Sequence, residues 1–187
     1  ISGESEFVLT EVADNLNSIE KINSINGLIY NNNSPQSNKR QDIISNMYNI
    51  SLYDYSIFDE MTFYRPYNGQ VLKAADIELS RGCPYTCSYC VETVIQEYYG
   101  FSDHGKKGVL KQASKYLRNK SAKRVYNEIK ILYDEHNVTL FRCQDTNFLS
   151  IQRSVLNELA SLIQDSDLPI MLYIETRPET INKNSID

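Results

Sequence analysis

The sequence predicts an α/β fold with a parallel sheet, and three observations in its second half lead there. Apolar or β-branched runs at 75–80, 137–143 and 168–176 indicate strands. Two amphipathic stretches, 121–136 and 150–165, separate these runs and predict helices. The connections are short. Strands and helices that alternate in this way favour parallel pairing with right-handed crossovers.

Length and composition fit a globular protein. The chain has 187 residues, of which 41% are hydrophobic and 23% are charged. Its net charge of −5 does not favour binding to a polyanion. It contains no apolar run near the ~18 residues of a membrane span and does not open on a signal segment. We therefore expect a cytoplasmic protein without a membrane partner.

The first half gives weaker signals. Residues 4–19 place Val8, Val12, Leu16 and Ile19 on one face and predict a single helix. The segment INGLIYNNN that follows predicts a short strand ending in an asparagine turn. The next forty residues are rich in Asn, Ser and Tyr without sustained periodicity, which is typical of a linker between domains.

The two helices of the second half have recognisable starts. Ser121 and Ser150 are the expected N-caps, because a serine hydroxyl accepts a hydrogen bond from a backbone N–H of the first turn. The strand at 168–176 is almost continuously apolar, so we expect it to be buried on both faces.

The strongest local signal is a cysteine motif. Cys83, Cys87 and Cys90 form C-x3-C-x2-C directly after the first predicted strand. In a reducing compartment such a cluster more often binds a metal or acts in catalysis than forms disulfides. Thiolates suit iron–sulfur clusters or zinc. Zinc sites usually combine paired C-x2-C motifs into four ligands, and the remaining cysteine, Cys143, is over fifty residues away.

The segment LSRGCPYTCSYC, with Tyr89 just before the last cysteine, resembles the signature of radical S-adenosylmethionine (SAM) enzymes. This resemblance implies a [4Fe–4S] cluster held by Cys83, Cys87 and Cys90, with its fourth iron open to the amino and carboxylate groups of SAM. An electron from the cluster would break the sulfonium C–S bond and release a 5′-deoxyadenosyl radical. The resemblance also implies that Tyr89 lies against the adenine, and that flavodoxin or ferredoxin supplies the electron.

Two strand ends add candidate SAM contacts. Gln144 and Asp145 stand where the family often has a Gly-Gly-Glu segment that receives the SAM amino group, although the glycines are missing here. Glu175 and Arg177 follow the third strand, where the family contacts SAM or substrate. The alternative for Asp145 is that it caps the following helix. The alternative for Glu175 and Arg177 is that they form a surface ion pair. We expect Cys143 to be buried and inert, with an auxiliary role as the alternative.

The opening of the chain resembles a further domain. Gly-Glu-Ser-Glu at 3–6 and the strand after it resemble the last helix and strand of the Rossmann-like cobalamin-binding domain that precedes many radical SAM barrels. The resemblance implies a cobalamin-domain remnant at 1–33, a linker at 34–73 and the first part of a partial (β/α) barrel at 74–187. The chain begins with Ile rather than Met and ends after a third strand, so we expect a fragment.

The function predicted from this resemblance is that of a cobalamin-dependent radical SAM enzyme acting on a small molecule. Methyl transfer to an unactivated carbon is the expected reaction. Rearrangement, oxidation or methylthiolation are the alternatives within the superfamily, and no catalytic side chain can be named. A non-catalytic zinc-binding module is the alternative from a different class of protein.

A basic stretch at 106–124 carries eight Lys or Arg and no acid. Binding of nucleic acid would require aromatic side chains among the basic ones, and Tyr116 is nearly alone. We therefore expect a solvated insertion and no nucleic-acid partner. Attraction of an anionic substrate is the alternative.

Overall fold

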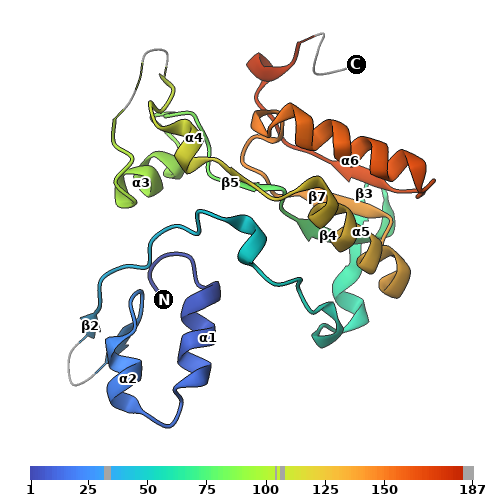
Figure 1. Ribbon diagram of the computed structural model, residues 1–187. Helices are drawn as coiled ribbons and strands as arrows, with labels where there is room; N and C mark the ends of the chain where they lie inside the picture. Colours follow the sequence, from blue (N-terminus) through green and yellow to red (C-terminus); the bar gives the residue numbers. More distant parts are fainter. Residues whose placement is uncertain (32–34, 104, 106–107, 183–187) are drawn as a thin grey trace. The chain divides into compact units, whose positions relative to one another are not determined.

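A computed structural model describes residues 1–31, 35–103, 105 and 108–182 of a mixed α/β protein (Figure 1). The chain divides into two compact units, Ile1–Asn46 and Met47–Asp187. Each is described by itself. No helix among the described residues is both long and apolar enough to cross a membrane.

The first unit contains two short helices and a two-stranded antiparallel sheet: α1 (Glu6–Asp14), α2 (Ile19–Ser24), β1 (Ile29–Asn31) and β2 (Pro35–Ser37). Val8, Ile25 and Ile44 are its buried apolar side chains. The Glu4 carboxylate accepts a 2.6 Å hydrogen bond from the Ile44 backbone N–H, which ties the start of this unit to its end.

The prediction of one helix over 4–19 is wrong, because polar residues end it early. The Asn15 side chain donates to the Glu11 carbonyl and its backbone N–H to the Val12 carbonyl, so these groups close α1 instead of extending it. Ser18 then accepts from the Lys21 backbone N–H and caps α2 as a separate helix.

The second unit is built on a four-stranded sheet in the order β3-β4-β7-β8: β3 (Tyr64–Tyr67), β4 (Gln70–Ile77), β7 (Leu140–Cys143) and β8 (Met171–Tyr173). Strands β3 and β4 form an antiparallel hairpin, whereas β4, β7 and β8 run parallel as predicted. Part of the segment interpreted as a linker thus belongs to this sheet, since β3 and the first residues of β4 lie within 34–73.

Helices α5 (Ala122–His136) and α6 (Arg153–Asp165) pack on one face of the sheet (Figure 1). Ile77, Phe141 and Ile129 are among the buried side chains of this core. Successive side chains along a strand point to opposite faces, so Asp76, which precedes Ile77 in β4, lies on the other face of the sheet. Ser121 caps α5 as predicted, with its hydroxyl accepting from the Arg124 backbone N–H at 3.2 Å.

The predicted start of α6 is wrong by two residues, because the N-cap is Gln152 rather than Ser150. Residues Phe148–Ser150 form a 3₁₀ turn, η5, and the Ser150 hydroxyl accepts from the Asn147 side chain at 2.6 Å. The helix therefore begins at Arg153, after Gln152, which makes no side-chain capping bond.

Strand β8 is also less buried than predicted. Its residues Met171, Leu172 and Tyr173 are 46%, 38% and 39% exposed. The reason is its place at the end of the strand order, because β7 is its only partner among the described strands.

Between β4 and α5 the chain forms α3 (Val91–Tyr98), α4 (Ala113–Tyr116) and a small antiparallel pair, β5 (Ser80–Arg81) and β6 (Arg118–Asn119). The described residues also form the 3₁₀ turns η1 (Met47–Asn49), η2 (Tyr55–Ile57), η3 (Glu60–Phe63) and η6 (Pro178–Thr180).

The expectation of a solvated insertion is wrong for the end of the basic stretch, whereas Lys111, Lys115 and Lys123 are exposed. Arg118 is buried, and Lys120 is fully buried, where its ammonium pairs with the Glu128 carboxylate at 3.1 Å. Lys111 is exposed and pairs with Asp103. Lys106 and Lys107 lie outside the described residues.

Candidate functional site

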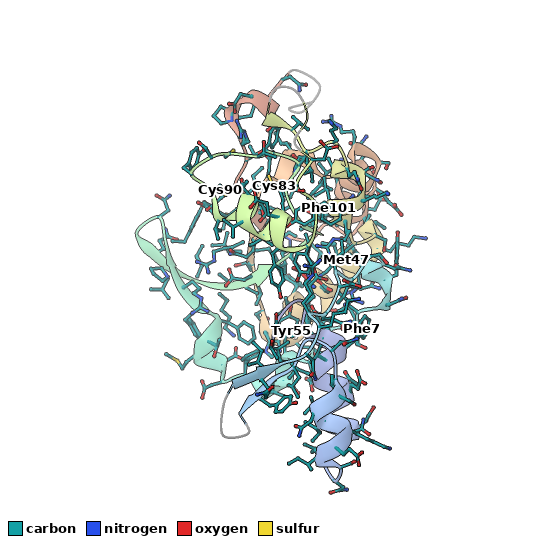
Figure 2. All side chains as sticks on the ribbon, turned by 90° about the vertical axis from the view of Figure 1, so that its left-hand side faces the viewer. Phe7, Met47, Tyr55, Cys83, Cys90 and Phe101 are labelled. Atoms are coloured by element: carbon teal, nitrogen blue, oxygen red, sulfur yellow. The ribbon has the colours of Figure 1, made fainter. Side chains whose placement is uncertain are left out.

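The cysteine loop, residues 83–90, follows the carboxyl end of β4, which is the edge where parallel α/β proteins build their sites. Gly82 leads into it with a φ of +87°. A Cβ at this position would stand 2.5 Å from the Tyr116 carbonyl oxygen, so only glycine fits between Arg81 and Cys83. Figure 2 shows Cys83 and Cys90 within this loop.

Side chains of α3 hold the loop backbone. Gln96 is fully buried, and its amide donates to the carbonyls of both Cys83 and Tyr85 at 2.9 Å. The Glu92 carboxylate accepts from the Cys83 backbone N–H at 3.1 Å, and the Thr93 hydroxyl donates to the Cys87 carbonyl at 2.9 Å. The helix that follows the motif thus satisfies the polar backbone of the loop.

Asp145, which follows β7, holds the backbone just before the cysteine loop. Its buried carboxylate accepts hydrogen bonds from the backbone N–H groups of Leu79 and Ser80 and from the Ser80 hydroxyl, at 2.6–3.2 Å. Burial raises the pKa of Asp145, although these donors act in the opposite direction. The carboxylate therefore serves the backbone between β4 and the loop, and the helix cap considered as its alternative is not formed.

The three loop thiols are free. Cys83 is buried and the other two are partly exposed. Burial raises the pKa of Cys83, and the neighbouring Glu92 carboxylate adds to this. Within the described residues, however, no three Cys, His, Asp or Glu side chains stand close enough to hold a metal ion.

The loop fits an iron–sulfur cluster by its donor chemistry. It offers three soft thiol ligands, and the Arg177 guanidinium lies 2.7 Å from the Cys87 sulfur. Ligation by all three thiols would therefore require side chains of the loop to move. The assignment of the three cysteines as ligands remains a prediction.

A network of charged and polar side chains surrounds Glu78, between β4 and the cysteine loop. Glu78, the residue after β4, accepts from the Tyr53 hydroxyl at 3.0 Å and from the Arg81 guanidinium at 2.7 Å, with the Lys120 ammonium at 3.6 Å. Burial alone would raise the pKa of Glu78, but these partners hold it below its usual value. The network joins β4, β5 and β6 at the base of the loop.

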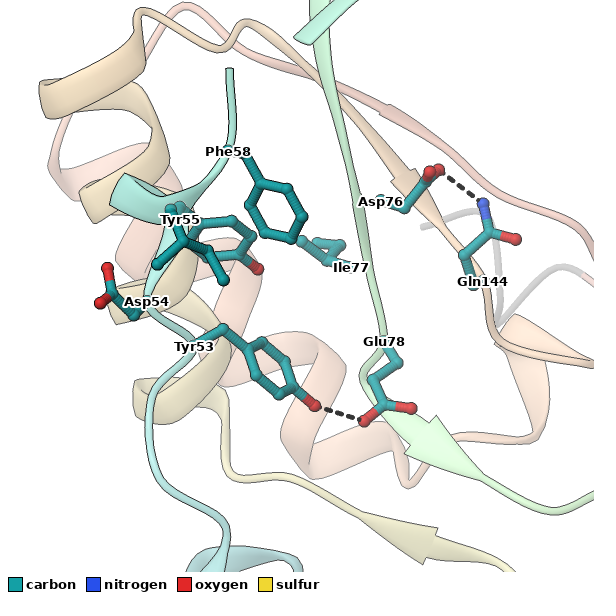
Figure 3. Close-up of a pocket in the computed structure, with 9 residues that line it drawn as sticks. Tyr53, Asp54, Tyr55, Phe58, Asp76, Ile77, Glu78 and Gln144 are labelled. Atoms are coloured by element: carbon teal, nitrogen blue, oxygen red, sulfur yellow. Dashed lines mark hydrogen bonds between the residues drawn. The ribbon is translucent and has the colours of Figure 1, made fainter. Parts of the chain in front are cut away.

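A pocket of about 490 Å³ adjoins this network (Figure 3). Tyr53, Tyr55 and Phe58 line it with Ile77, and Figure 3 shows their rings on one side of β4. Burial raises the pKa of Tyr55 to about 12, so its hydroxyl stays protonated at neutral pH.

Gln144 and Glu175, predicted from two different strand ends, meet in another pocket. This pocket of about 420 Å³ is lined by both of them together with Arg142, Tyr173, Tyr67 and Pro66. The Gln144 amide donates to Asp76 at 2.7 Å, and Arg142 pairs with the same carboxylate. The sheet thus brings these two predicted side chains together on the face away from α5 and α6.

The remaining candidates lie elsewhere. Arg177 approaches the cysteine loop and donates to the Cys87 sulfur at 2.7 Å; its ion pair is with Glu179, not with Glu175. Tyr89 is 90% exposed. Cys143 is buried in the core, where burial and the Asp145 charge raise its pKa to about 12, as expected for an inert thiol.

The sequence motifs did not indicate Glu78, Glu92 or Gln96 as residues of the site. Glu92 and Gln96 are four residues apart on the helix after the motif and so share the face toward the loop. This spacing could have identified them. The role of Glu78 depends on Tyr53 and Lys120, which lie far from it in sequence, and no local signal indicates that.

Comparison with known proteins gives likenesses in sequence and in fold. No family model matches the chain. The chain is 22% identical over 191 aligned residues to the anaerobic magnesium-protoporphyrin IX monomethyl ester cyclase of Synechocystis, covering 99% of this chain and 33% of the relative.

Two solved structures share the fold. One is the cobalamin-dependent S-adenosylmethionine radical enzyme OxsB, solved with aqua-cobalamin and S-adenosylmethionine bound, with a TM-score of 0.63 and 14% identity over 98% of this chain and 23% of OxsB. The other is the radical S-adenosylmethionine methyltransferase TsrM of Kitasatospora setae, solved with cobalamin and a [4Fe–4S] cluster, with a TM-score of 0.60 and 19% identity over 97% of this chain and 34% of TsrM.

The chain therefore spans about a quarter to a third of the length of these proteins. Almost all of it aligns with each of them, and both solved structures are radical SAM enzymes. These likenesses confirm that the chain resembles the radical SAM superfamily, including its cobalamin-dependent members.

Proposed function

We propose that the chain is part of a cobalamin-dependent radical SAM enzyme that cleaves S-adenosylmethionine reductively and transfers a methyl group to an unactivated carbon of a small molecule. The observation that carries this proposal is the C-x3-C-x2-C loop at the carboxyl end of the first parallel strand. Bound there, a [4Fe–4S] cluster would supply the electron that breaks the sulfonium C–S bond, and cobalamin would supply methyl-transfer chemistry.

The residues around the loop have distinct tasks in this proposal. Cys83, Cys87 and Cys90 provide three ligands, which leaves one iron open for the SAM amino and carboxylate groups. Asp145 and Gln96 keep the loop backbone in place.

The pocket that contains Gln144 and Glu175 would receive the polar end of SAM. Glu175 is a suitable partner for the SAM amino group because it is an exposed carboxylate beside a polar pocket. Tyr89 is available to stack on the adenine, since its ring is exposed beside the last cysteine.

Anaerobic reconstitution with iron and sulfide tests the metal site. We expect a brown protein with about four irons per chain, as a single cubane cluster requires, and formation of 5′-deoxyadenosine once SAM and dithionite are added. Cys90→Ser should abolish both, whereas Cys143→Ser is the matched control and should leave the iron content unchanged. A colourless protein that holds one zinc would contradict the proposal and support a binding module.

One observation favours a different reaction at the same site. The curated relative is a cyclase, and its name implies no methyl transfer. Oxidative cyclisation or rearrangement is therefore the second candidate. SAM with an isotopically labelled methyl group separates the two with candidate small molecules, because only methyl transfer moves the label into the product and leaves S-adenosylhomocysteine.

A further inference from the structure

We propose that the pocket lined by Tyr53, Tyr55 and Phe58 beside β4 binds a small, uncharged, flat molecule with an adjacent N–H donor and carbonyl acceptor, such as a lactam. Its volume of about 490 Å³ is in the range of pockets that hold small organic ligands. The binding requires no cluster. Gln144 lines both this pocket and the one proposed for the polar end of SAM. Such a molecule is therefore the class of substrate that we infer, and this last step alone rests on the proposed function.

Three aromatic rings form the apolar wall of the pocket. The ring centres of Tyr53 and Tyr55 are 6.2 Å apart with the rings nearly perpendicular, and those of Tyr55 and Phe58 are 6.4 Å apart with the rings tilted. Figure 3 shows these rings and Ile77 on the same side of β4. A further flat ring can pack against the faces or edges of such tilted rings. Because Phe58 is 49% exposed, the ligand would also remove apolar surface from water.

The free edge of β4 supplies a donor and an acceptor beside this wall. The Gln144 backbone N–H donates to the Ile77 carbonyl at 2.8 Å, so the backbone groups of Ile77 face β7. Alternate residues of a strand turn these groups to opposite edges, so the N–H and C=O of Asp76 face away from β7. On that edge β3 pairs only with Gln70–Lys73. Within the described residues no strand therefore pairs with Asp76 there, and its two backbone groups match the C=O and N–H of a lactam.

The Tyr55 hydroxyl is a further polar group that a ligand can reach. Tyr55 is partly exposed and lines the pocket. Its hydroxyl forms no hydrogen bond with any other part of the chain that the structure describes, whereas the Tyr53 hydroxyl is bonded to Glu78. Burial raises the pKa of Tyr55 to about 12, so the group keeps its proton at neutral pH and can donate to a ligand oxygen.

The charges at the pocket favour an uncharged ligand. Among the described residues that line it, Asp54, Asp76 and Glu78 are acidic and none is basic, which disfavours an anion. A cation gains little either, because two of these carboxylates already have cationic partners. Glu78 is bound by Arg81, and Asp76 is bound by Arg142. The third, Asp54, is exposed, so water and salt screen its charge.

Isothermal titration calorimetry of the metal-free wild-type chain with 2-quinolinone, a flat lactam, tests the site. Three probes share its fused rings and change one property each. The compound 1-methyl-2-quinolinone lacks the N–H, quinoline-2-carboxylate is an anion, and N-methylquinolinium is a cation. We expect saturable binding of 2-quinolinone at one site. The N-methyl compound should bind about tenfold more weakly, because it leaves the Asp76 carbonyl without a donor. Both ions should bind more weakly than 2-quinolinone.

Substitutions in the pocket locate the binding. Phe58→Ala removes one ring of the wall and should weaken binding of 2-quinolinone about tenfold. Tyr55→Phe removes only the hydroxyl and should weaken it about threefold. Met61→Ala is the matched control, because Met61 is 71% exposed and does not line the pocket, and it should bind like the wild type. Circular dichroism checks that each variant folds. If Phe58→Ala does not fold, Phe58→Leu takes its place, since leucine keeps apolar bulk without the ring.

Four results would each overturn the inference: no binding of 2-quinolinone to the wild type, equal binding of its N-methyl form, tighter binding of either ion, or wild-type affinity in the Phe58 variant. Because these measurements need no iron, such a failure leaves the proposed function standing. Wild-type protein that binds the lactam but assembles no cluster on reconstitution would instead overturn the proposed function and support the binding site alone.

Discussion

The helix-covered face of the sheet and the cysteine loop are held by different forces. The face is an apolar core in which side chains such as Phe141 and Ile129 are fully buried. No residue of the loop at 83–90 belongs to this core cluster, and polar side chains from α3 and from the end of β7 bind the backbone of the loop and of the residues just before it. The core gains stability from area removed from water, whereas the loop depends on a few buried hydrogen bonds that are costly to leave unmade.

The largest expected effect concerns the reactivity of the buried Cys143 thiol. Cys143 belongs to the core, and its pKa of about 12 leaves almost no thiolate at pH 8.5. We expect alkylation of Cys143 by iodoacetamide to be on the order of a thousandfold slower in the folded protein than in urea, where a cysteine has its ordinary pKa.

Mass spectrometry of the labelled peptide over time measures this rate. Raising the pH should speed the folded-state reaction about tenfold per unit, because the thiolate fraction grows in that proportion below the pKa. Equal rates in buffer and in urea would show that Cys143 is not part of a closed core.

Removing a large core side chain is the next test. Phe141→Ala should lower the free energy of unfolding by about 3–5 kcal/mol, since it loses apolar burial and leaves a cavity. Leu172→Ala is the matched control, because Leu172 pairs with Phe141 across β7 and β8 but is 38% exposed. Urea denaturation measures both. A control that costs as much as Phe141→Ala would mean that β8 is buried in solution.

Asp145 tests the attachment of the loop to the sheet. Asp145→Ala leaves the backbone N–H groups of Leu79 and Ser80 without their acceptor and should cost about 2–3 kcal/mol of unfolding free energy. Asp145→Asn should cost less, because one amide oxygen can still accept.

The pH dependence of this effect has a defined sign. A carboxyl group whose pKa is raised by folding binds more protons in the folded state, so its contribution to stability falls as the pH rises through that pKa. The advantage of wild type over Asp145→Asn should therefore be larger near pH 4.5 than at pH 7. An advantage that grows toward pH 7 would show that the bound donors outweigh burial.

Gln96 tests the loop from the α3 side. Gln96→Leu removes both bonds to the loop carbonyls, but it also removes a buried side-chain oxygen, Oε1, that has no hydrogen-bond partner. We expect a net loss of about 1–2 kcal/mol. Gln96→Glu should be worse, because it places an acceptor-only carboxylate against two carbonyls. If Glu is tolerated better than Leu, the amide does not donate as described.

The sequence predicts the apolar core better than the surroundings of the loop. The core depends on local patterns of apolar residues, whereas the loop depends on polar contacts between residues far apart in the chain. Helix α5 and the parallel strand pairing follow from periodicity and apolar runs, which are local signals of burial. The meeting of Gln144 and Glu175 follows from the shared edge of parallel strands. The burial of Lys120 cannot be predicted from such local signals, because its partner Glu128 and the overlying Tyr53 come together only in the folded chain.

Hydrophobic periodicity predicts helix ends poorly where polar side chains compete with the backbone hydrogen bonds of the helix. Asn15 and Ser18 split a helix whose apolar face continues in the sequence, and Asn147 and Ser150 delay α6. In each case a side chain satisfies a neighbouring polar group, which hydrophobic periodicity does not register. Arg177 is a similar case, because its strand-end position predicts a polar contact but not that this contact is with the Cys87 sulfur.

The smallest expected effect concerns the cap of α5, where sequence and structure agree. Ser121→Ala removes the acceptor of the Arg124 backbone N–H and should lower the free energy of unfolding by about 1 kcal/mol. Ser154→Ala is the matched control, because Ser154 is exposed inside the first turn of α6 and alanine is the better helix former there, so a change within about 0.5 kcal/mol is expected. Thermal unfolding followed by circular dichroism resolves the difference. Equal effects of the two substitutions would mean that the Ser121 hydroxyl does not cap the helix in solution, and that the agreement at this position rests on helix propensity alone.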